Sequence, residues 1–540
     1  MRAFAELLDR LSLTSSRNAK LTMVRDYLRD TPDPDRGWAL AALTGELSFD
    51  AAKPAFIRKA VEARMDPQLF WWSYDYVGDL AEAVSLVWPA RPGANREPQL
   101  SEVIDGLSSA TRAEAQGRIE AWLDALPQAR ERWALLKLVT GALRVGLSAR
   151  LAKQATADLG GVPVAEVEEL WHALRPPYED LFAWLEGRSE KPSSENPARF
   201  RPVMLAQAID EDVDFGKLDP AAYAAEWKWD GIRVQAAHEG GQRRLYTRTG
   251  DDISRTFPDI LDAMDDEGVI DGELLVIRDG KVAPFADLQQ RLNRKTVDAK
   301  LMAAFPAAIR AYDILQAGAE DTRPLPFAER RARLEAFVAR EASPRIDLSP
   351  IQPFATWAEL AELRADPPAG DPQIAEGLML KRWDSAYEAG RPKGPWFKWK
   401  RDPFLVDAVL MYAQRGHGKR SSYYSDYTFG VWTQDEAGQR MLTPVGKAYF
   451  GFTDEELLQI DKFVRDNTIE RFGPVRSVRA EPRHGLVFEV AFEGLQRSTR
   501  HKSGVAMRFP RISRIRWDKP PGEADELPTL ERMLEKMEGR

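Results

Sequence analysis

The segment "EWKWDGIRVQ", residues 226–235, is the stretch on which the interpretation of the middle of the chain depends. It places a lysine between two tryptophans and continues into an Asp-Gly pair and an arginine. A lysine flanked by large apolar rings is poorly hydrated, which favours the neutral amine and hence a nucleophile. The same letters also fit a plain strand that ends in an Asp-Gly turn, with the lysine facing solvent. This segment alone leaves both interpretations open.

As a strand, the segment would alternate its side chains between two faces. Glu226 and Lys228 would then share one face, while Trp227 and Trp229 would point to the other. We therefore expect the tryptophans to be structural and the glutamate to lie beside the lysine.

The bulk composition describes a globular protein of several domains. At 540 residues the chain is too long for one core, and about three domains are expected. It contains 44% hydrophobic and 30% charged residues, with no apolar run of about 18 residues and no secretion-signal pattern. These features predict a cytoplasmic protein without a membrane span.

The content of cysteine and histidine limits the available chemistry. The chain has no cysteine, which excludes disulfides, thiolate zinc sites and a cysteine nucleophile. Five histidines disfavour a multi-histidine metal centre. Any metal is therefore expected to be a hard cation such as Mg²⁺ on carboxylates.

The net charge of -8 hides three basic stretches. Residues 497–519 carry eight Lys/Arg against one acid, Asp518, while residues 391–401 and residues 132–153 each carry five and no acid. These stretches could be ordinary solvated faces. Their convergence on a phosphate-rich ligand is the favoured interpretation.

The first 185 or so residues have helical periodicity. Phe4, Leu7, Leu8 and Leu11, for example, fall on one face of a helix. Residues 186–202, "EGRSEKPSSENPARFRP", are polar, Ser/Pro-rich and non-periodic, which indicates a linker. We expect an all-α domain over residues 1–200.

From about Met204 the sequence changes to short β-like runs with a few helices between them, such as "VIDGELLVIRDGKV" and "FAERRARLEAFVAR". This pattern predicts an α+β domain over residues 201–402. Residues 403–540 are mostly strand-like, and their length and pattern fit a small barrel of the oligonucleotide-binding (OB) type. The expected fold is therefore a multidomain α+β protein.

The central region contains a series of short polar strings at strand ends or turns. In chain order they are "EWKWDGIR", "TRTG" (residues 247–250), "DGE" (271–273), "YD" (312–313), "EGLMLK" (376–381) and "WFKWK" (396–400). Each string alone is ordinary turn or strand chemistry. Their order and spacing together are far more specific.

In this order the strings resemble the motifs of the covalent nucleotidyltransferases, and most closely those of the ATP-dependent DNA ligases. The resemblance covers nearly the whole chain. The string "RFPRISRIRWDKP", residues 508–520, is similar to the family's last motif in its C-terminal barrel. "LVTGALRVGLS" and "VGDLAEAV" resemble the helical DNA-binding domain of the larger members.

The resemblance implies a reaction in which Lys228 attacks the α-phosphorus of ATP and retains AMP. AMP then passes to the 5′-phosphate of a nick in duplex DNA, and the 3′-hydroxyl displaces it. The implied cofactors are ATP and Mg²⁺, with Glu273 and Glu376 as the metal ligands. Binding of ATP or AMP is assigned to Glu226, Arg233, Arg248, Glu273, Tyr312, Lys381, Lys398, Lys400, Arg516 and Lys519.

Among these residues, Glu226 would help to read adenine and Tyr312 would stack on it. Arg233 and Arg248 would contact ribose and phosphate through their forked donors, and Lys381 would add a cation near the base or phosphate.

In the last motif, Arg516, Asp518 and Lys519 match the family's Arg-x-Asp-Lys string. It would orient the pyrophosphate leaving group, although a basic strand that only grips DNA is the alternative. Strand alternation places Arg514 and Arg516 on one side. Contacts with DNA are expected from Lys137, Arg144, Arg150, Lys153, Arg508 and Arg511.

Three other classes remain as alternatives. An RNA ligase or RNA-capping nucleotidyltransferase shares the lysine motif, but the long helical region with its own basic stretch favours duplex DNA. NAD-dependent ligases carry a four-cysteine zinc module, which this chain lacks. A non-catalytic nucleic-acid-binding protein would require Lys228 to have no role. The expected partner is nicked double-stranded DNA, and the expected state is a monomer.

Overall fold

The computed structural model describes the chain except residues 50–53, 78, 92, 94–95, 142, 172, 193–196, 293, 295–296, 366–374, 417–421, 436, 500 and 538–540. The side chains of residues 75 and 76 are also left undescribed. The chain forms two compact units. One comprises Met1–Val167, Leu174–Pro192 and Pro403–Arg540, and the other, called the central unit below, comprises Glu168–Ala173 and Ser193–Asp402. Among the described residues, every helix is too short or too polar to cross a membrane.

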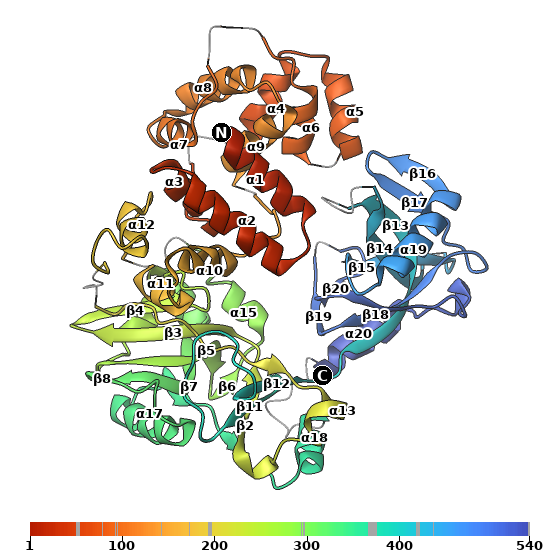
Figure 1. The fold of residues 1–540 in the computed structure, drawn as a ribbon. Coiled ribbons are helices and arrows are strands. Elements are labelled where there is room, and N and C mark those ends of the chain that lie inside the picture. Colours follow the sequence, from red (N-terminus) through yellow and green to blue (C-terminus); the bar gives the residue numbers. More distant parts are fainter. Residues whose placement is uncertain are drawn as a thin grey trace. The chain divides into compact units, whose positions relative to one another are not determined.

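The N-terminal segment, residues 1–192, is helical, as predicted (red to orange in Figure 1). Its helices are α1 (Arg2–Leu13), α2 (Arg17–Asp30), α3 (Asp35–Thr44), α4 (Pro54–Glu62), α5 (Pro67–Val77), α6 (Leu80–Val87), α7 (Leu100–Ser108), α8 (Arg112–Ala125), α9 (Ala129–Thr140), α10 (Ala149–Gly160), α11 (Val164–Leu170) and α12 (Glu179–Leu185).

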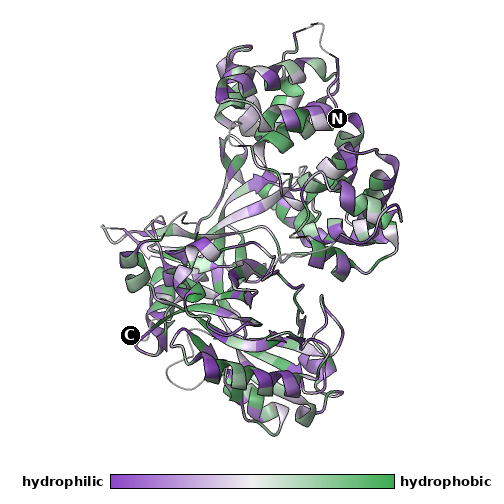
Figure 2. Cartoon of the chain, turned by 90° about the vertical axis from the view of Figure 1, so that its left-hand side faces the viewer, coloured by the Kyte–Doolittle hydropathy of each residue, from purple (hydrophilic) through white to green (hydrophobic). Residues whose placement is uncertain are grey.

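Helices α1, α4 and α7 are clearly amphipathic, and polar and apolar residues interleave along the chain (Figure 2). In α1, the predicted apolar face is confirmed, because Phe4, Leu7, Leu8 and Leu11 are all buried.

One sheet of the central unit carries the lysine segment. Its strands run in the order β1-β12-β11-β2-β10. They are β1 (Gln207–Ala208), β2 (Tyr223–Trp229), β10 (Ile351–Gln352), β11 (Ala375–Arg382) and β12 (Trp396–Lys400). Except for the parallel pair β1 and β12, neighbouring strands are antiparallel. The strings "EWKW", "EGLMLK" and "WFKWK" are thereby brought onto three adjacent strands.

A second sheet of the central unit runs in the order β4-β3-β5-β7-β8, with β6 beside β5 and β9 beside β7. Its strands are β3 (Ile232–Glu239), β4 (Gln242–Thr247), β5 (Gly268–Arg278), β6 (Lys281–Val282), β7 (Ala307–Ala317), β8 (Glu320–Asp321) and β9 (Ile346–Leu348). The longer helices of this unit are α17 (Phe327–Glu341), which packs on β7, and α18 (Trp357–Ala365). Short helices are η1 (Pro220–Ala222), η2 (Ser254–Thr256), α13 (Glu211–Asp214), α14 (Pro258–Leu261), α15 (Phe285–Gln289) and α16 (Ala299–Ala304).

The C-terminal segment, residues 403–540, is mainly β, as predicted (blue in Figure 1). Its strands are β13 (Phe404–Arg415), β14 (Tyr424–Gln434), β15 (Arg440–Ala448), β16 (Thr468–Phe472), β17 (Val475–Val478), β18 (Val487–Phe492), β19 (Gly494–Arg497), β20 (Val505–Arg508) and β21 (Arg511–Ile515). The main sheet has the order β15-β14-β13-β17-β16, and β18 bridges β13 and β21. The helices α19 (Asp454–Asp466) and α20 (Leu527–Met537) and the turn η4 (Pro521–Glu523) were not anticipated from the sequence.

The predicted linker, residues 186–202, needs correction at its C-terminal end. Residues 193–196 lie outside the described part of the chain. Beyond them, Ala198 and Phe200 are buried, and Arg201 binds Glu239 at 2.7 Å. The phenol of Tyr246 also donates to the carbonyl of Ala198 at 2.9 Å. Polar composition predicted a loose segment, but these long-range contacts bind its end to the central unit.

Candidate active site

Lys228 lies near the end of β2, and its neighbours alternate as predicted. Trp227 and Trp229 are buried in an apolar core that also includes Phe397 and Trp399 of β12. The side chain of Lys228 is 25% exposed on the opposite face. The flanking tryptophans therefore fix the strand, while the lysine remains accessible.

A β-bulge brings Glu376 to Lys228. The register of β11 on β2 shifts between Ala375 and Leu378, which inserts one extra residue into β11. The carboxylate of Glu376 forms an ion pair with the ammonium of Lys228. Without the bulge, alternation would place Glu376 on the same face as Leu378, in the apolar core.

Gly377 makes this bulge possible. Its φ of +139° is accessible to glycine, and a Cβ at this position would lie 2.7 Å from the Cα of Lys400 and closer still to the carbonyl of Trp399. The Glu-Gly pair of "EGLMLK" thus combines a charged ligand with the backbone freedom needed to present it.

We expect Gly377→Ala to lower the free energy of unfolding by roughly 3 kcal/mol, because backbone strain and a clash act together. Covalent AMP uptake should fall at least about tenfold as Glu376 is displaced. Denaturant unfolding and a labelling time course measure the two effects. The matched control is Gly280→Ala, at a φ of +75° with open space around the Cβ. It should cost about 1 kcal/mol through strain alone and leave AMP uptake unchanged. Equal effects of the two substitutions would contradict this account of the bulge.

Glu273 approaches the same lysine from the second sheet. It lies on β5 opposite Arg233 of β3. The turn between β2 and β3 passes close to β5, because a Cβ on Gly231 would lie 2.9 Å from the Cγ of Glu273. The residues quoted from "EWKWDGIR" and "DGE" therefore meet where the two sheets come together.

The carboxyl group of Glu273 is buried beside the ion pair of Lys228 and Glu376. Burial, together with the charge of Glu376, raises the pKa of Glu273 to about 8, against the opposing influence of Lys228 and Arg233. A carboxyl group that retains its proton at neutral pH is one that a divalent cation would help to ionise. In the described part of the chain no cluster of three or more potential metal ligands is found. A pair of carboxylates fits Mg²⁺, which commonly takes one or two such ligands and completes its shell with phosphate and water.

Lys398 and Lys400 of β12 complete the charged face. Lys398 pairs in register with Met379 and Lys400 with Gly377. Burial and the positive charges of Lys400, Arg391 and Lys228 lower the pKa of Lys398. The Nζ of Lys400 lies 3.9 Å from Glu376. Three lysines thus stand near each other, which is an arrangement suited to a polyanion such as a triphosphate.

Glu226 is held at the buried end of this face. Its carboxylate lies 3.1 Å from the Nζ of Lys381 and 3.5 Å from Arg331 of α17. The side chains of Glu226 and Lys381 are each only 1% exposed. Burial raises the pKa of the Glu226 carboxyl, and the charges of Lys381 and Arg331 counteract that rise.

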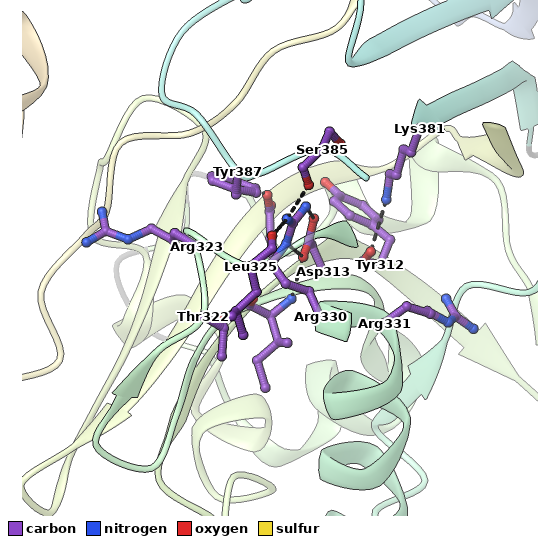
Figure 3. A network of polar contacts seen from close by, with 12 residues as sticks. Tyr312, Asp313, Thr322, Arg323, Leu325, Arg330, Arg331, Lys381, Ser385 and Tyr387 are labelled. Atoms are coloured by element: carbon purple, nitrogen blue, oxygen red, sulfur yellow. Dashed lines mark hydrogen bonds and ion pairs between the residues drawn. The ribbon is translucent and has the colours of Figure 1, made fainter. Parts of the chain in front are cut away.

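Lys381 also supports Tyr312. Its ammonium donates to the carbonyl of Tyr312 at 3.0 Å and lies 4.6 Å from the centroid of that ring (Figure 3). Lys381 was predicted as a cation near the base or phosphate. Since its ammonium binds both Glu226 and the carbonyl of Tyr312, it would also act on a nucleotide by positioning these two residues.

A buried ion pair fixes the strand segment next to Tyr312. Arg330 of α17 donates to Asp313 at 2.8 and 3.0 Å, and both side chains are fully buried. Arg330 also donates to the carbonyls of Leu325 and Ser385 (Figure 3). A guanidinium with this many acceptors is well satisfied, which makes the position of β7 rigid.

Arg233 is held in a second buried cluster. It donates twice to Asp271, at 3.0 and 2.6 Å, and also to the carbonyl of Met204 and the phenol of Tyr387. These bonds occupy most of the N–H groups that an arginine offers. Its contact with ribose or phosphate remains a prediction, and this contact would use the N–H group that these bonds leave over.

Arg248 lies exposed in the turn after β4, where Thr247 pairs with Val234, the neighbour of Arg233. This register places Arg248 at the same end of the sheet as Arg233. Its contact with the nucleotide remains a prediction.

The residues predicted in the last motif lie at the end of the C-terminal segment. Arg514 lies 2.9 Å and Arg516 4.0 Å from Glu489 of β18, which agrees with their expected placement on one side. Arg508 ends β20 and Arg511 begins β21, and both are half-buried.

The N-terminal basic stretch is divided by the fold. Arg144 is exposed, and Arg150 and Lys153 lie half-exposed on α10. Lys137, in contrast, is only 8% exposed and binds Asp79 at 2.6 Å. The predicted contact of Lys137 with DNA stays a prediction, and such a contact would require breaking this ion pair.

Sequence reasoning missed several residues that shape the site. Asp271 and Tyr387 hold Arg233, while Arg331 contacts Glu226. Asp271 stood within the quoted "DGE" string and could have been found there. Arg331 lies in an ordinary amphipathic helix, and no local signal distinguishes it from a solvated arginine.

The comparisons with known proteins agree with this geometry. The family model described as "ATP dependent DNA ligase domain" matches residues 203–400. The model described as "ATP dependent DNA ligase C terminal region" matches residues 420–519. The chain is 31% identical to a probable DNA ligase of Koribacter versatilis, over 99% of this chain and 96% of that protein. It is 30% identical to DNA ligase 1 of Korarchaeum cryptofilum, over 99% of this chain and 98% of that one.

A solved structure titled Pmar-Lig_PreS3 shares the fold, with a TM-score of 0.59 and 15% identity over 95% of this chain and 99% of that chain. The two family models together cover more than half of the chain and make it a nucleotidyltransferase. The chain belongs to the family of ATP-dependent DNA ligases, and its activity is that of this family, the ATP-dependent joining of DNA.

Proposed function

We propose that this chain seals nicks in duplex DNA through a covalent AMP on Lys228. The observation that carries the proposal is the convergence on Lys228 of Glu376 and Lys400 from one sheet and Glu273 from the other. This convergence supports a site in which Lys228 would be the nucleophile, beside a pair of carboxylates and additional cations. Such an arrangement suits a phosphoryl-type displacement, in which positioning and charge neutralisation dominate.

The first step forms a bond between the Nζ of Lys228 and the α-phosphorus of ATP. The bond from this phosphorus to the bridging oxygen breaks, and its electron pair leaves with pyrophosphate. The amine must lose a proton to attack. That proton passes to solvent as the ion pair of Lys228 with Glu376 opens. Lys398 and Lys400 would hold the phosphates in this step.

The second and third steps transfer AMP to DNA and release it. An oxygen of the 5′-phosphate at the nick attacks the AMP phosphorus, and the bond to Lys228 breaks. The 3′-hydroxyl then loses its proton to solvent and attacks the 5′-phosphorus, and AMP leaves with the electron pair of the broken bond as the new phosphodiester forms.

Glu273 and Glu376 are the residues that would hold Mg²⁺. A bound Mg²⁺ would neutralise charge on the reacting phosphates. The raised pKa of Glu273, which comes mainly from burial, is in keeping with this assignment, because a bound cation would favour the ionised carboxylate.

The nucleobase would lie at the Glu226 end of the face. A carboxylate held between Lys381 and Arg331 can accept from the exocyclic amine of adenine, while the Tyr312 ring can stack on the base. Lys381 would contribute by positioning both groups.

We further propose that the chain is organised as a helical DNA-binding domain (residues 1–200), an adenylylation domain (201–402) and an OB-fold domain (403–540). The antiparallel C-terminal strands, with α19 between β15 and β16, support the OB-fold assignment. Nicked duplex DNA as the substrate, a monomeric state and a cytoplasmic location belong to the same proposal.

Two assays test this function. Incubation with α-³²P-ATP, followed by denaturing electrophoresis, should show covalent label on the chain. A ligation assay should then seal nicked DNA with ATP in preference to nicked RNA, and should fail with NAD. Label from GTP or faster sealing of RNA would instead favour a capping enzyme or an RNA ligase.

The exposed Arg144 and the half-exposed Arg150 and Lys153 of the N-terminal segment should contribute phosphate contacts. We expect replacement of Arg144, Arg150 and Lys153 by Gln to make the slope of log K against log salt shallower by about two to three. For each phosphate contact that is lost, fewer counterions are released when DNA binds. Self-adenylylation should be unchanged, because its residues lie elsewhere. Filter binding or fluorescence anisotropy over a salt series measures the slope.

The matched control removes three other exposed basic residues of the same segment, Arg10, Arg17 and Lys59. A control that lowers the slope equally would show that net charge, and not this stretch, determines DNA binding.

The last motif should serve the first step specifically. We expect Arg516→Ala and Lys519→Ala to slow adenylylation from ATP roughly 100-fold, because each removes a charged donor to pyrophosphate. Sealing of a pre-adenylylated nick should change little. Arg511→Ala should behave in the opposite way, with normal AMP uptake and weaker DNA binding. If Arg516→Ala took up AMP normally and failed on both nicked substrates, the motif would belong to the DNA contacts.

A further inference from the structure

The two cations of the last motif meet on one carboxylate of the C-terminal segment. The Nη1 of Arg516 lies 3.2 Å and the Nζ of Lys519 2.7 Å from the same oxygen, Oδ2, of Asp407. Asp407 is only 8% exposed, on β13. A residue more than a hundred positions earlier in the chain therefore holds both ends of the Arg-x-Asp-Lys string.

The fold fixes the position of this carboxylate. Asp407 pairs in register with Glu489 of β18. Its backbone N–H donates to the carboxylate of Asp525 at 2.8 Å, and the N–H of Asp525 donates to the carbonyl of Asp407 at 2.9 Å. This reciprocal pair, together with the sheet, leaves the Asp407 side chain little freedom.

The Arg-x-Asp-Lys string, residues 516–519, forms a turn next to Asp407. The N–H of Lys519 donates to the carbonyl of Arg516 at 3.2 Å, and the N–H of Arg516 donates to Val487 at 2.8 Å. Asp518 accepts from Arg516 at 3.0 and 2.9 Å. Beyond these bonds, Arg516 and Lys519 each retain N–H groups that can bind a further anion.

Two cations held this close repel each other, and an anion between them offsets that repulsion. Arg516 and Lys519 have side-chain exposures of 19% and 23%, so screening by water is incomplete. Without Asp407 the two side chains would separate, and the spacing that lets both bind one diphosphate would be lost.

We propose that Asp407 is a positioning residue for lysine adenylylation, which sets the spacing of Arg516 and Lys519 for a pyrophosphate leaving group. This rests on the proposed function, which assigns those two residues to pyrophosphate. Asp407 acts through them and does not touch the substrate, because a carboxylate would repel pyrophosphate.

The test uses the full chain with Asp407→Asn, which keeps the shape and the backbone pair but removes the charge. Adenylylation from ATP should fall roughly 10-fold to 30-fold. In the reverse reaction, in which the AMP-bound enzyme and pyrophosphate regenerate ATP, the KM for pyrophosphate should rise about tenfold. Sealing of a pre-adenylylated nick should stay within about twofold, which a general loss of structure would not allow.

Glu489→Gln is the matched control. Glu489 faces Asp407 across the strand pair and is also half of an ion pair, but its closer partner is Arg514 at 2.9 Å. All three measurements should stay within about twofold of the parent. If Asp407→Asn lowers the melting temperature, Asp407→Glu is measured in the same way. This variant retains the charge but displaces it by one methylene. Like Asp407→Asn, it should adenylylate more slowly from ATP and seal a pre-adenylylated nick at nearly the parent rate.

Unchanged or faster adenylylation by both Asp407 variants would overturn the inference, as would equal losses on ATP and on the pre-adenylylated nick. Failure of the proposed function is a separate result. If Arg516→Ala and Lys519→Ala adenylylate normally, the motif does not serve pyrophosphate at all. If those two variants fail and the Asp407 variants do not, only the role of Asp407 is refuted.

Discussion

In the Lys228→Ala variant we expect covalent AMP uptake to fall by roughly 10,000-fold or more, because the variant lacks the amine that would form the phosphoramidate. Lys398 and Lys400 lie on the same face but belong to β12, where they would hold phosphates. Sealing of a nick that already carries 5′-adenylate should persist at a reduced rate. The last step needs the carboxylates and the remaining cations, and not the amine. Gel labelling with α-³²P-ATP and a single-turnover sealing assay measure the two steps.

Two further variants test whether Lys228 acts as a nucleophile or only as a positive charge. Lys228→Arg retains a cation beside Glu376, but a guanidinium stays protonated and cannot attack phosphorus. It should therefore be as inactive in labelling as the alanine variant. Lys217→Ala removes an exposed lysine of the same unit and should label normally. Normal label on either Lys228 variant would refute the assignment of the nucleophile.

Strand alternation in "EWKWDGIRVQ" predicted the faces of β2 from the sequence alone. The structure confirms that Trp227 and Trp229 are buried while Lys228 is accessible. The pattern succeeded because β2 buries an apolar face along its whole length, so the period of two is uninterrupted.

The position of Glu376 could not be predicted in the same way. Strict alternation groups it with Leu378 and Leu380, which belong to the core. The one-residue bulge at Gly377 reverses this placement, and bulges leave only a weak signal in a single sequence. The assignment of Glu376 came from the resemblance of the motifs, and not from periodicity.

Contacts between segments that are distant in the chain could also not be predicted from the sequence. Arg331 and Asp407 have the local patterns of an ordinary helix and an ordinary strand. Their importance comes from partners more than a hundred residues away, Glu226 for Arg331 and Lys519 for Asp407. Lys137 shows the converse. Its basic neighbourhood suggested a surface role, but the fold buries it against Asp79.

The carboxylates at Lys228 provide the second large effect. We expect Glu376→Gln and Glu273→Gln each to slow adenylylation by roughly 100-fold to 10,000-fold. On the proposed function each variant loses a ligand of Mg²⁺, and with it several kcal/mol of charge stabilisation in the transition state. For Glu376 an opposing effect exists, since its loss also frees Lys228 from an ion pair and favours the neutral amine. The two side chains of that pair are 25% and 22% exposed. A partly exposed pair contributes up to about 1 kcal/mol, so the loss of the metal ligand should dominate.

The measurements must distinguish slower adenylylation in the Glu376 and Glu273 variants from weaker DNA binding. Affinity for nicked duplex should stay within about twofold in both variants, because DNA binding depends on basic residues elsewhere. Raising the Mg²⁺ concentration should restore part of the activity by mass action, if each variant retains one carboxylate ligand. Glu320→Gln is the control, because Glu320 is an exposed carboxylate of the same unit that pairs with Arg333. This variant should keep the parent's adenylylation rate and its affinity for nicked duplex. A Glu376 variant that adenylylates faster than the parent would reverse the argument. Its carboxylate would then restrain Lys228, and the metal would have to be held by other residues.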